Sequence, residues 1–203
     1  MTDDWARLGA LTAAAFAALA ASLVIVLHLV RTDVDPREDG VSAYALTRFA
    51  SLYHAQVIAT GVACLLLILG LVAGGFEPGG AAIVLALFGV SRILIARYPT
   101  DPRGTIRLSR AGRIHVLLAA CTFVAIAVVA PWISGILTTS PGWHGPTTGI
   151  VALGWATTVL ALGTFGAGGL PAARRVFGLV ERGAYAASLL WIVVAALSVA
   201  RWI

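Results

Sequence analysis

Residues 114–173 decide the fold, reading IHVLLAACTFVAIAVVAPWISGILTTSPGWHGPTTGIVALGWATTVLALGTFGAGGLPAA. These sixty consecutive residues include no Asp, Glu, Lys or Arg. A transmembrane helix needs roughly 20 apolar residues in a row. The segment SPGWHGP at 140–146 divides the stretch into two such helices joined by a short loop. The sequence therefore predicts a multi-span integral membrane protein.

The rest of the chain extends this pattern. Hydrophobic residues make up 60% of the 203 residues and charged residues only 11%, whereas about 25% of residues in soluble domains are charged. We predict an all-α fold, an integral membrane bundle of six transmembrane helices that forms a single domain over residues 1–203. The N-terminal apolar segment has an acidic start and full span length, so we take it as the first helix and not as a cleaved signal. The predicted spans are about 8–30, 49–74, 81–97, 114–137, 150–170 and 183–200.

The basic residues are distributed unequally between the loops. All fourteen are Arg, and twelve of them belong to the side of loops 31–48, 97–113 and 174–182. The positive-inside rule predicts that these loops are cytoplasmic and that both termini are extracytoplasmic. Topology explains the basic residues, so we expect no nucleic-acid partner and place the protein in the cell (plasma) membrane as a multi-pass protein.

The polar residues gather at the same side of the predicted bundle as these Arg residues. An ionisable residue at membrane depth is a candidate for a functional site and usually faces the bundle interior. We therefore expect His54, Arg92, Asp101 and His115 to converge. The candidate catalytic residues are Asp101, His115 and His54, and the candidate ligand-binding residues are Arg92, Arg97, Arg103, Ser42 and Ser51.

Short motifs in this region resemble those of the DUF998 family of six-span bacterial integral membrane proteins. They are Tyr98-Pro99-Thr100-Asp101, then Gly112-Arg113-Ile114-His115, and Ser42-Ala43-Tyr44-Ala45 before the second span. Many relatives have an acid at the position of Ala43. The resemblance implies six helices with a polar site at one membrane face, and it implies no established reaction.

One hypothesis for the polar residues is a metal site. His28, His54 and His115 belong to three predicted helices at one depth, with Asp101 near them, and such a set suits Zn²⁺ with an open position for water. The sequence contains no His-x-x-x-His or Glu-x-x-His pair, the local spacing that metal sites often show. The alternative is that the His residues form hydrogen bonds with loop backbone. A b-type haem between His54 and His115 is disfavoured because both lie at span ends.

A second hypothesis is recognition of an anionic lipid head group by Arg92, Arg97 and Arg103, since Arg forms bidentate bonds with phosphate. Alternatively, Arg92 extends its side chain to the membrane surface. Asp101 lies between two prolines and beside two Arg residues, and we expect it to be more than a turn cap.

Two function classes follow from these patterns. In the first, the protein binds or acts on an anionic or amide lipid, as a binder or as an enzyme. In the second, it is a non-catalytic accessory subunit that contacts other membrane protein subunits. A cleft that reaches the polar residues would favour the first class, and closed ion pairs would favour the second.

Overall fold

The computed structural model describes residues 2–141, 143, 145–170 and 172–202. These residues form α-helices and two short 3-10 helices and include no strand, so the prediction of an all-helical fold is confirmed. The helices are α1 (Thr2–Leu29), η1 (Val41–Leu46), α2 (Ala50–Ala73), α3 (Gly79–Ile95), α4 (Arg110–Thr139), α5 (Thr147–Gly169), η2 (Arg174–Val176) and α6 (Phe177–Trp202).

Five of these helices are long and apolar enough to cross a membrane, namely α1, α2, α4, α5 and α6. Helix α3 is apolar but has only 17 residues. At 1.5 Å per residue it is about 26 Å long, which is slightly less than the roughly 30 Å of bilayer hydrocarbon. Helices α4 and α6 extend beyond the predicted apolar segments because helical structure continues into polar residues such as Arg110 and Glu181.

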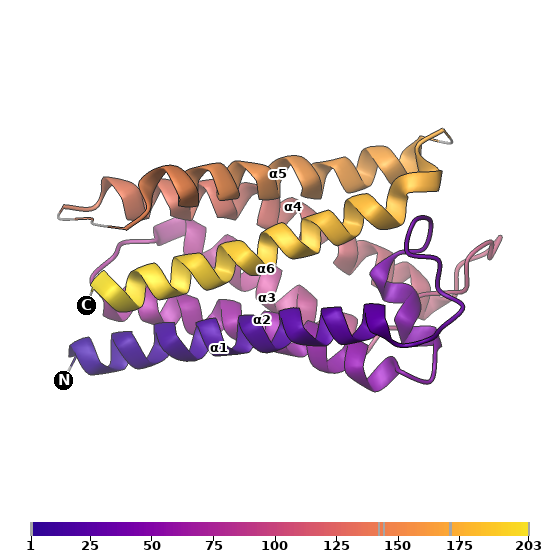
Figure 1. The fold of residues 1–203 in the computed structure, drawn as a ribbon, viewed down its shortest axis with the longest axis horizontal. Helices are drawn as coiled ribbons and strands as arrows, with labels where there is room; N and C mark the ends of the chain where they lie inside the picture. The colour runs from indigo at the N-terminus through magenta and orange to yellow at the C-terminus, as the bar shows by residue number, and fades with distance from the viewer. Residues whose placement is uncertain (1, 142, 144, 171, 203) are drawn as a thin grey trace.

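The α-helices run along the long axis of the molecule (Figure 1). Both termini lie at one end, together with the short loops 74–78 and 140–146. The longer connections 30–49, 96–109 and 170–176 lie at the opposite end. We call these the terminal end and the loop end. The loops that carry most of the Arg residues therefore share one end of the bundle.

Small residues set the distances between neighbouring helices. A Cβ atom at Gly61 of α2 would collide with the carbonyl oxygen of Gly89 in α3, and a Cβ at Gly70 would lie 3.0–3.2 Å from Ala10 of α1. Glycine is therefore required where these backbones approach, as is typical of helix packing in membranes.

The terminal end is also tied by side-chain hydrogen bonds. The Ser134 hydroxyl of α4 donates to the Ile150 carbonyl of α5 over 3.1 Å, and the Trp191 indole of α6 donates to the Ser134 oxygen over 2.9 Å. Gly154 of α5 packs against this point, where an added Cβ would lie 2.8 Å from the Ser134 oxygen. Helices α4, α5 and α6 are thus closely joined here.

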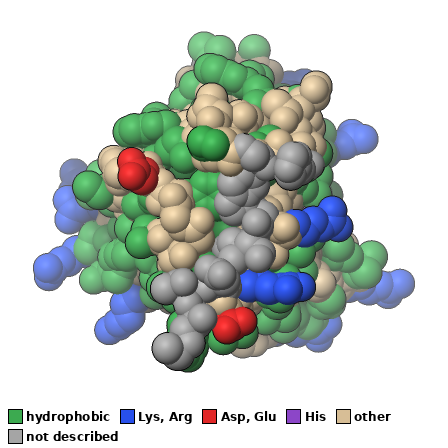
Figure 2. Space-filling view, turned by 90° about the vertical axis from the view of Figure 1, so that its left-hand side faces the viewer, with side chains coloured by type: hydrophobic (Ala, Val, Ile, Leu, Met, Phe, Trp, Pro, Cys, Tyr) green, Lys and Arg blue, Asp and Glu red, His purple; other side chains and the backbone are tan. Residues whose placement is uncertain are grey.

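The outer surface of the bundle is apolar. Seen from the terminal end, hydrophobic side chains make up much of the outline (Figure 2). Large side chains on several helices are strongly exposed, such as Ile83 at 74%, Leu117 at 65% and Val159 at 68%. Exposed apolar area on this scale requires an apolar environment, and it agrees with a membrane protein.

Candidate functional site

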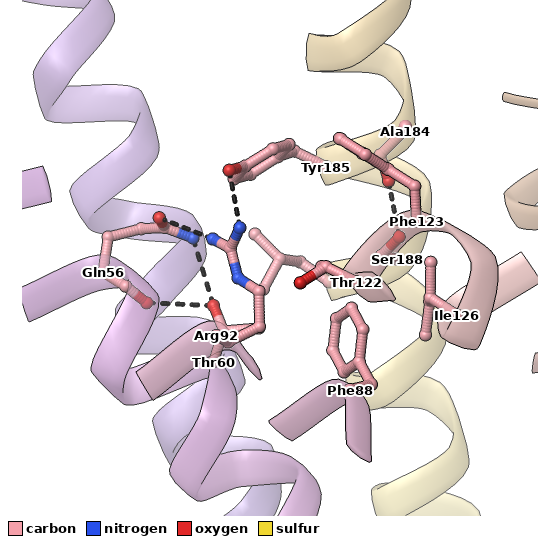
Figure 3. Close-up of a pocket in the computed structure, with 11 residues that line it drawn as sticks. Gln56, Thr60, Phe88, Arg92, Thr122, Phe123, Ile126, Ala184, Tyr185 and Ser188 are labelled. Carbon is pink, nitrogen blue, oxygen red and sulfur yellow. Dashed lines mark hydrogen bonds between the residues drawn. The ribbon is translucent and has the colours of Figure 1, made fainter. Parts of the chain in front are cut away.

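The most unusual side chain of the bundle is Arg92, which is only 3% exposed inside the apolar helix α3. Its Nη1 donates to the Tyr185 hydroxyl of α6 over 2.6 Å, and its Nη2 donates to the Gln56 side-chain carbonyl of α2 over 3.0 Å. Figure 3 shows the guanidinium group held between these two side chains. Arg92 therefore points into the bundle and joins three helices.

The sequence explains why α2 and α3 bring Gln56 and Arg92 together. The close contact of Gly61 with Gly89 lies about one turn away along each helix. Helices α2 and α3 are antiparallel. Gln56, five residues before Gly61, and Arg92, three residues after Gly89, therefore lie on the same side of the glycine contact. The glycine contact thus sets the helix spacing at which the Arg92 side chain reaches α2.

The partners of Arg92 are uncharged. The guanidinium carbon also lies 4.6 Å from the centre of the Tyr185 ring, and no ion pair joins Arg92 to a carboxylate among the described residues. Its Nε is buried without a hydrogen-bond partner in the described part of the chain. A small cavity of about 20 Å³ beside the group, lined also by Thr122 and Ser188, has space for about one water molecule.

The predicted motif around Asp101 forms the start of α4. The Ser109 side chain caps this helix by accepting from the Gly112 backbone N–H over 2.9 Å, and the Asp101 carboxylate accepts from the Ser109 N–H over 2.7 Å. A Cβ atom at Gly112 would collide with the Asp101 carboxylate. The negative charge at the N-terminus of α4 is favourable, and Gly112 provides the space for it.

His115 is one turn further along α4 and is 4% exposed. Its Nδ1 lies 2.8 Å from the Tyr98 carbonyl oxygen. A carbonyl oxygen can only accept, so Nδ1 carries the hydrogen and Nε2 of the neutral ring is an acceptor. Nε2 has no hydrogen-bond partner among the described residues, yet it is not buried. It therefore faces the open space that His115 lines.

The N-terminal part of α6 holds the loop 30–49. The Glu181 carboxylate, 6% exposed, accepts from the Val41 N–H over 2.6 Å. Arg182 donates from Nη1 to the Asp39 carbonyl over 2.7 Å and from Nε to the His28 Nε2 over 2.6 Å. His28 is therefore part of the attachment of this loop to α6.

A cleft of about 870 Å³ opens at the loop end. Its polar part includes Tyr53, Arg92, His115, Glu181 and Tyr185. Its apolar part comes mainly from α4 and α5 and includes Val116, Ala119, Ala120, Phe123 and Phe165. The size lies within the range of ligand pockets, about 300–1,000 Å³. A ligand with both a polar and an apolar part matches this lining.

Charged residues surround the aqueous side of the cleft. Arg103 donates to the Glu38 carboxylate over 2.6 Å and to the Asp39 carboxylate over 3.2 Å, which joins loop 96–109 to loop 30–49. The hydrogen bond and charge of Glu38, together with Asp39, raise the pKa of Arg103 above its ordinary value. Arg174 and Asp101 also line the cleft.

The structure brings part of the predicted site together. Among the described residues, the cleft is lined by Ser42, Arg92, Asp101, Arg103 and His115. It is not lined by His28, Ser51, His54 or Arg97. His54 lies beside Tyr53 with its Nε2 buried and unpartnered, and Ser51 is exposed. Arg92 converges with Asp101 and His115 at the cleft, and His54 does not.

The four predicted metal ligands do not form one group. The described residues contain no group of three or more His, Cys, Asp or Glu side chains that could hold a metal ion. Instead, His28 binds Arg182, and His115 binds a backbone carbonyl. In the described structure His28, His54, His115 and Asp101 do not lie together, because residues at one depth on different helices can face different directions, and metal binding stays a prediction.

Several cleft residues were absent from the predicted set. Tyr53, Gln56, Glu181 and Tyr185 contact Arg92 or line the cleft with it. Gln56 and Tyr185 are polar side chains within membrane-spanning helices, and a polar group at that depth is the signal that could have identified them. The spacing of residues along the sequence does not indicate that these two side chains pair with Arg92.

A family model described as "Protein of unknown function (DUF998)" matches residues 5–198, nearly the whole chain. The resemblance seen in the motifs is therefore confirmed. Neither the curated proteins nor the solved structures gave a match to the chain.

Proposed function

The chain belongs to the DUF998 family, and from that premise we propose that it is a six-span membrane protein that binds a lipid with an anionic head group in the loop-end cleft. The family and the apolar helices indicate a membrane protein. This proposal includes the identity of the ligand, the crossing of the membrane by α3 as a sixth span, and the orientation of the protein in the membrane.

The buried guanidinium of Arg92 is the observation that carries the proposal. Burying a charge without a counter-ion is costly, and the hydrogen-bonding partners of Arg92, Gln56 and Tyr185, are both uncharged. They use two of its five N–H groups. The Glu181 carboxylate lines the same cleft, but it accepts from the Val41 N–H and forms no ion pair with Arg92 among the described residues. An anionic group in the cleft would pair directly with Arg92 through strong charge-assisted hydrogen bonds.

The inward direction of Arg92 argues against the simpler explanation that its side chain reaches the membrane surface. A side chain of that kind extends its charged end into water. Arg92 is 3% exposed and is bonded to α2 and α6. The site favours a role inside the bundle.

His115 supplies the second recognition element. Its Nε2 is free to accept a hydrogen bond in the same cleft that Arg92 lines as a donor. A head group that combines an anion with a nearby hydroxyl or amide N–H would match both groups. The same acceptor atom is suited to general-base chemistry, since a neutral imidazole takes up a proton near neutral pH.

The open cleft supports this proposal over an accessory subunit. A subunit that used its polar residues to lock helices would have them in closed pairs. Here Arg92 and His115 both line a space of about 870 Å³.

The orientation in this proposal follows the distribution of Arg residues. Twelve of fourteen belong to the loop end, so the cleft opens toward the cytoplasmic leaflet and both termini are extracytoplasmic. Helix α3 crosses the membrane with slight thinning of the bilayer or with its polar flanks at the interface. A reporter fused to the C-terminus tests the orientation, and a cytoplasmic signal contradicts it.

The test of binding compares Arg92→Gln with Arg107→Gln. Both remove one Arg at the loop end, but Arg107 is exposed and does not line the cleft. Protein released from phosphatidylcholine nanodiscs containing some phosphatidic acid is analysed by native mass spectrometry. We expect Arg92→Gln to lower bound phosphatidic acid about tenfold or more, since a hydrogen bond to a charged group contributes roughly 1.5–3 kcal/mol.

Arg107→Gln should bind like the wild type. Equal binding of phosphatidic acid by wild type and Arg92→Gln, both folded by circular dichroism and gel filtration, overturns the proposal.

A further inference from the structure

Helices α4 and α5 are close at the terminal end and separate at the loop end. At the middle of both helices, the Thr158 hydroxyl of α5 donates to the Ala127 carbonyl of α4 over 2.6 Å. Toward the loop end, the start of α4 and the end of α5 diverge (Figure 1), and residues of both line the cleft. No hydrogen bond joins the two helices beyond Ala127 and Thr158 in this direction among the described residues.

Three aromatic side chains mark the point of separation. Phe123 of α4 contacts Phe165 of α5 edge-on, with ring centres 6.3 Å apart, and contacts Tyr185 of α6 with ring centres 6.5 Å apart. Edge-on contacts at these distances are favourable. Phe123 and Tyr185 therefore form the inner boundary of the space between α4 and α5, and Phe165 lines this space from α5.

The space beyond these rings is lined by small or apolar side chains. Ala119 and Ala120 line it from α4, and Gly168 and Gly169 line it from α5. At its outer side, Val116 is 51% exposed and Phe165 is 43% exposed. These exposed side chains belong to the apolar outer surface of the bundle, which in a bilayer contacts lipid. The cleft is thus open toward the bilayer as well as toward water.

We propose that the ligand enters sideways from the surrounding leaflet between α4 and α5, and that its acyl chain lies against Ala119, Ala120 and Gly168 while its anionic head group reaches Arg92. This inference rests on the proposed function, and it identifies the ligand as a bilayer lipid with long acyl chains.

The charges at the aqueous side favour this route over entry of a soluble anion. Glu38, Asp39 and Asp101 line that side, and Arg103 is already paired with two of these acids. A free anion would approach three carboxylates before it reached Arg92. A lipid that moves within the leaflet meets small and apolar side chains and, beside Gly168, the positive charge of Arg174, whose Nε donates to the Gly168 carbonyl over 3.4 Å. Its chain removes the apolar wall from contact with water.

Two glycines of α5 provide a matched pair of variants. Gly168 lines the cleft, and a Cβ added to it would lie 3.4 Å from the Phe177 ring, which is an ordinary contact. Gly166 is exposed, does not line the cleft, and has nothing within 4 Å of an added Cβ. Both are helical. Gly168→Leu therefore adds a side chain to the cleft beside Phe177, whereas Gly166→Leu adds the same side chain outside the cleft.

The experiment measures dipalmitoyl and dihexanoyl phosphatidic acid bound to each variant in phosphatidylcholine nanodiscs by native mass spectrometry. We expect Gly168→Leu to reduce binding of the long-chain lipid about tenfold, with a smaller change for the short-chain lipid, and Gly166→Leu to match the wild type. Thermal melts establish that all variants are folded.

The inference is overturned if Gly168→Leu binds the long-chain lipid as the wild type does, if both lipids lose binding equally, or if Gly166→Leu has the same effect. Failure of the proposed function has a different result, since wild type and Arg92→Gln would then bind equal amounts of both lipids.

Discussion

The two ends of this bundle use the same three helices in opposite ways. At the terminal end, α4, α5 and α6 are joined through Ser134, Ile150 and Trp191 with a glycine at the closest approach. At the loop end, α4 separates from α5 beside a cleft of about 870 Å³, whereas α5 and α6 remain close, with an added Cβ at Gly163 only 3.3 Å from Val180. The aromatic contacts of Phe123 lie at the boundary. One membrane bundle can therefore combine a rigid end with an open end.

The difference shows how polar groups are accommodated within apolar helices. At the terminal end, several hydroxyls donate to nearby carbonyls, as Ser134 does to Ala130 and Ile150. At the loop end, Arg92 and His115 keep bonding capacity that faces the cleft. Satisfied groups hold helices together, whereas groups that keep bonding capacity at membrane depth are candidates for ligand binding.

The largest effect should come from disrupting the rigid end. Gly154→Leu places a side chain where an added Cβ already lies 2.8 Å from the Ser134 oxygen. We expect it to reduce the free energy of unfolding by about 3 kcal/mol, as overpacking does. Unfolding in sodium dodecyl sulfate measures this change, with Gly166→Leu as the control. Equal stability of the two variants would mean that α4 and α5 are not closely packed there.

The next effect concerns the start of α4. Gly112→Ala forces a Cβ against the Asp101 carboxylate, and we expect a loss of about 2 kcal/mol. In an Asp101→Ala background the same change should stabilise the protein, since Ala favours a helix over Gly by about 1 kcal/mol. A double-mutant cycle of unfolding free energies measures this coupling.

Additive effects of the two substitutions would mean that Asp101 does not contact Gly112. Asp101→Asn is a milder variant, because its side-chain carbonyl can still accept from Ser109 while the charge at the helix N-terminus is lost. If it abolishes binding while the cap is kept, Asp101 has a role beyond the cap.

A smaller effect is expected from His115→Asn. The Asn amide can donate to the Tyr98 carbonyl as Nδ1 of His115 does, but it has no group at the place of Nε2. We expect phosphatidic acid binding to fall about fivefold, equivalent to roughly 1 kcal/mol, with little change in melting temperature. If melting temperature falls as far as in His115→Ala while binding is kept, the residue is structural only.

The smallest effect is expected at the aqueous side of the cleft. Arg103 is exposed, and exposed ion pairs contribute little to stability. Arg103→Gln should leave the melting temperature unchanged. Glu38 and Asp39 raise the pKa of Arg103, so mildly alkaline pH should not break this pair either. A clear drop in melting temperature would show that the pair holds the two loops together.

Much of the secondary structure could be predicted from the sequence because a transmembrane helix depends mainly on a local run of apolar residues. Residues 114–173 gave two helices with a break at 140–146, close to α4 and α5. The motif from Tyr98 to His115 likewise predicted that Asp101 and His115 lie close together. They are joined by a short loop and one helix turn.

The partners of Arg92 could not be predicted in this way. In a soluble helix the apolar face identifies the core, but here the lipid-facing and core-facing sides are both apolar, so periodicity does not show which way a residue points. For this reason His54 and Arg97 were grouped with Arg92, although neither lines the cleft.

The sequence by itself determined an all-helical membrane protein, with the Arg-rich loops and most polar residues toward one end, because hydropathy and charge act locally along the chain. Only the tertiary structure decided that Gln56 and Tyr185 hold Arg92, and that α4 and α5 separate beside it. Those features depend on the register and spacing between helices. For Gln56 and Arg92, the contact of Gly61 with Gly89 sets this spacing between α2 and α3.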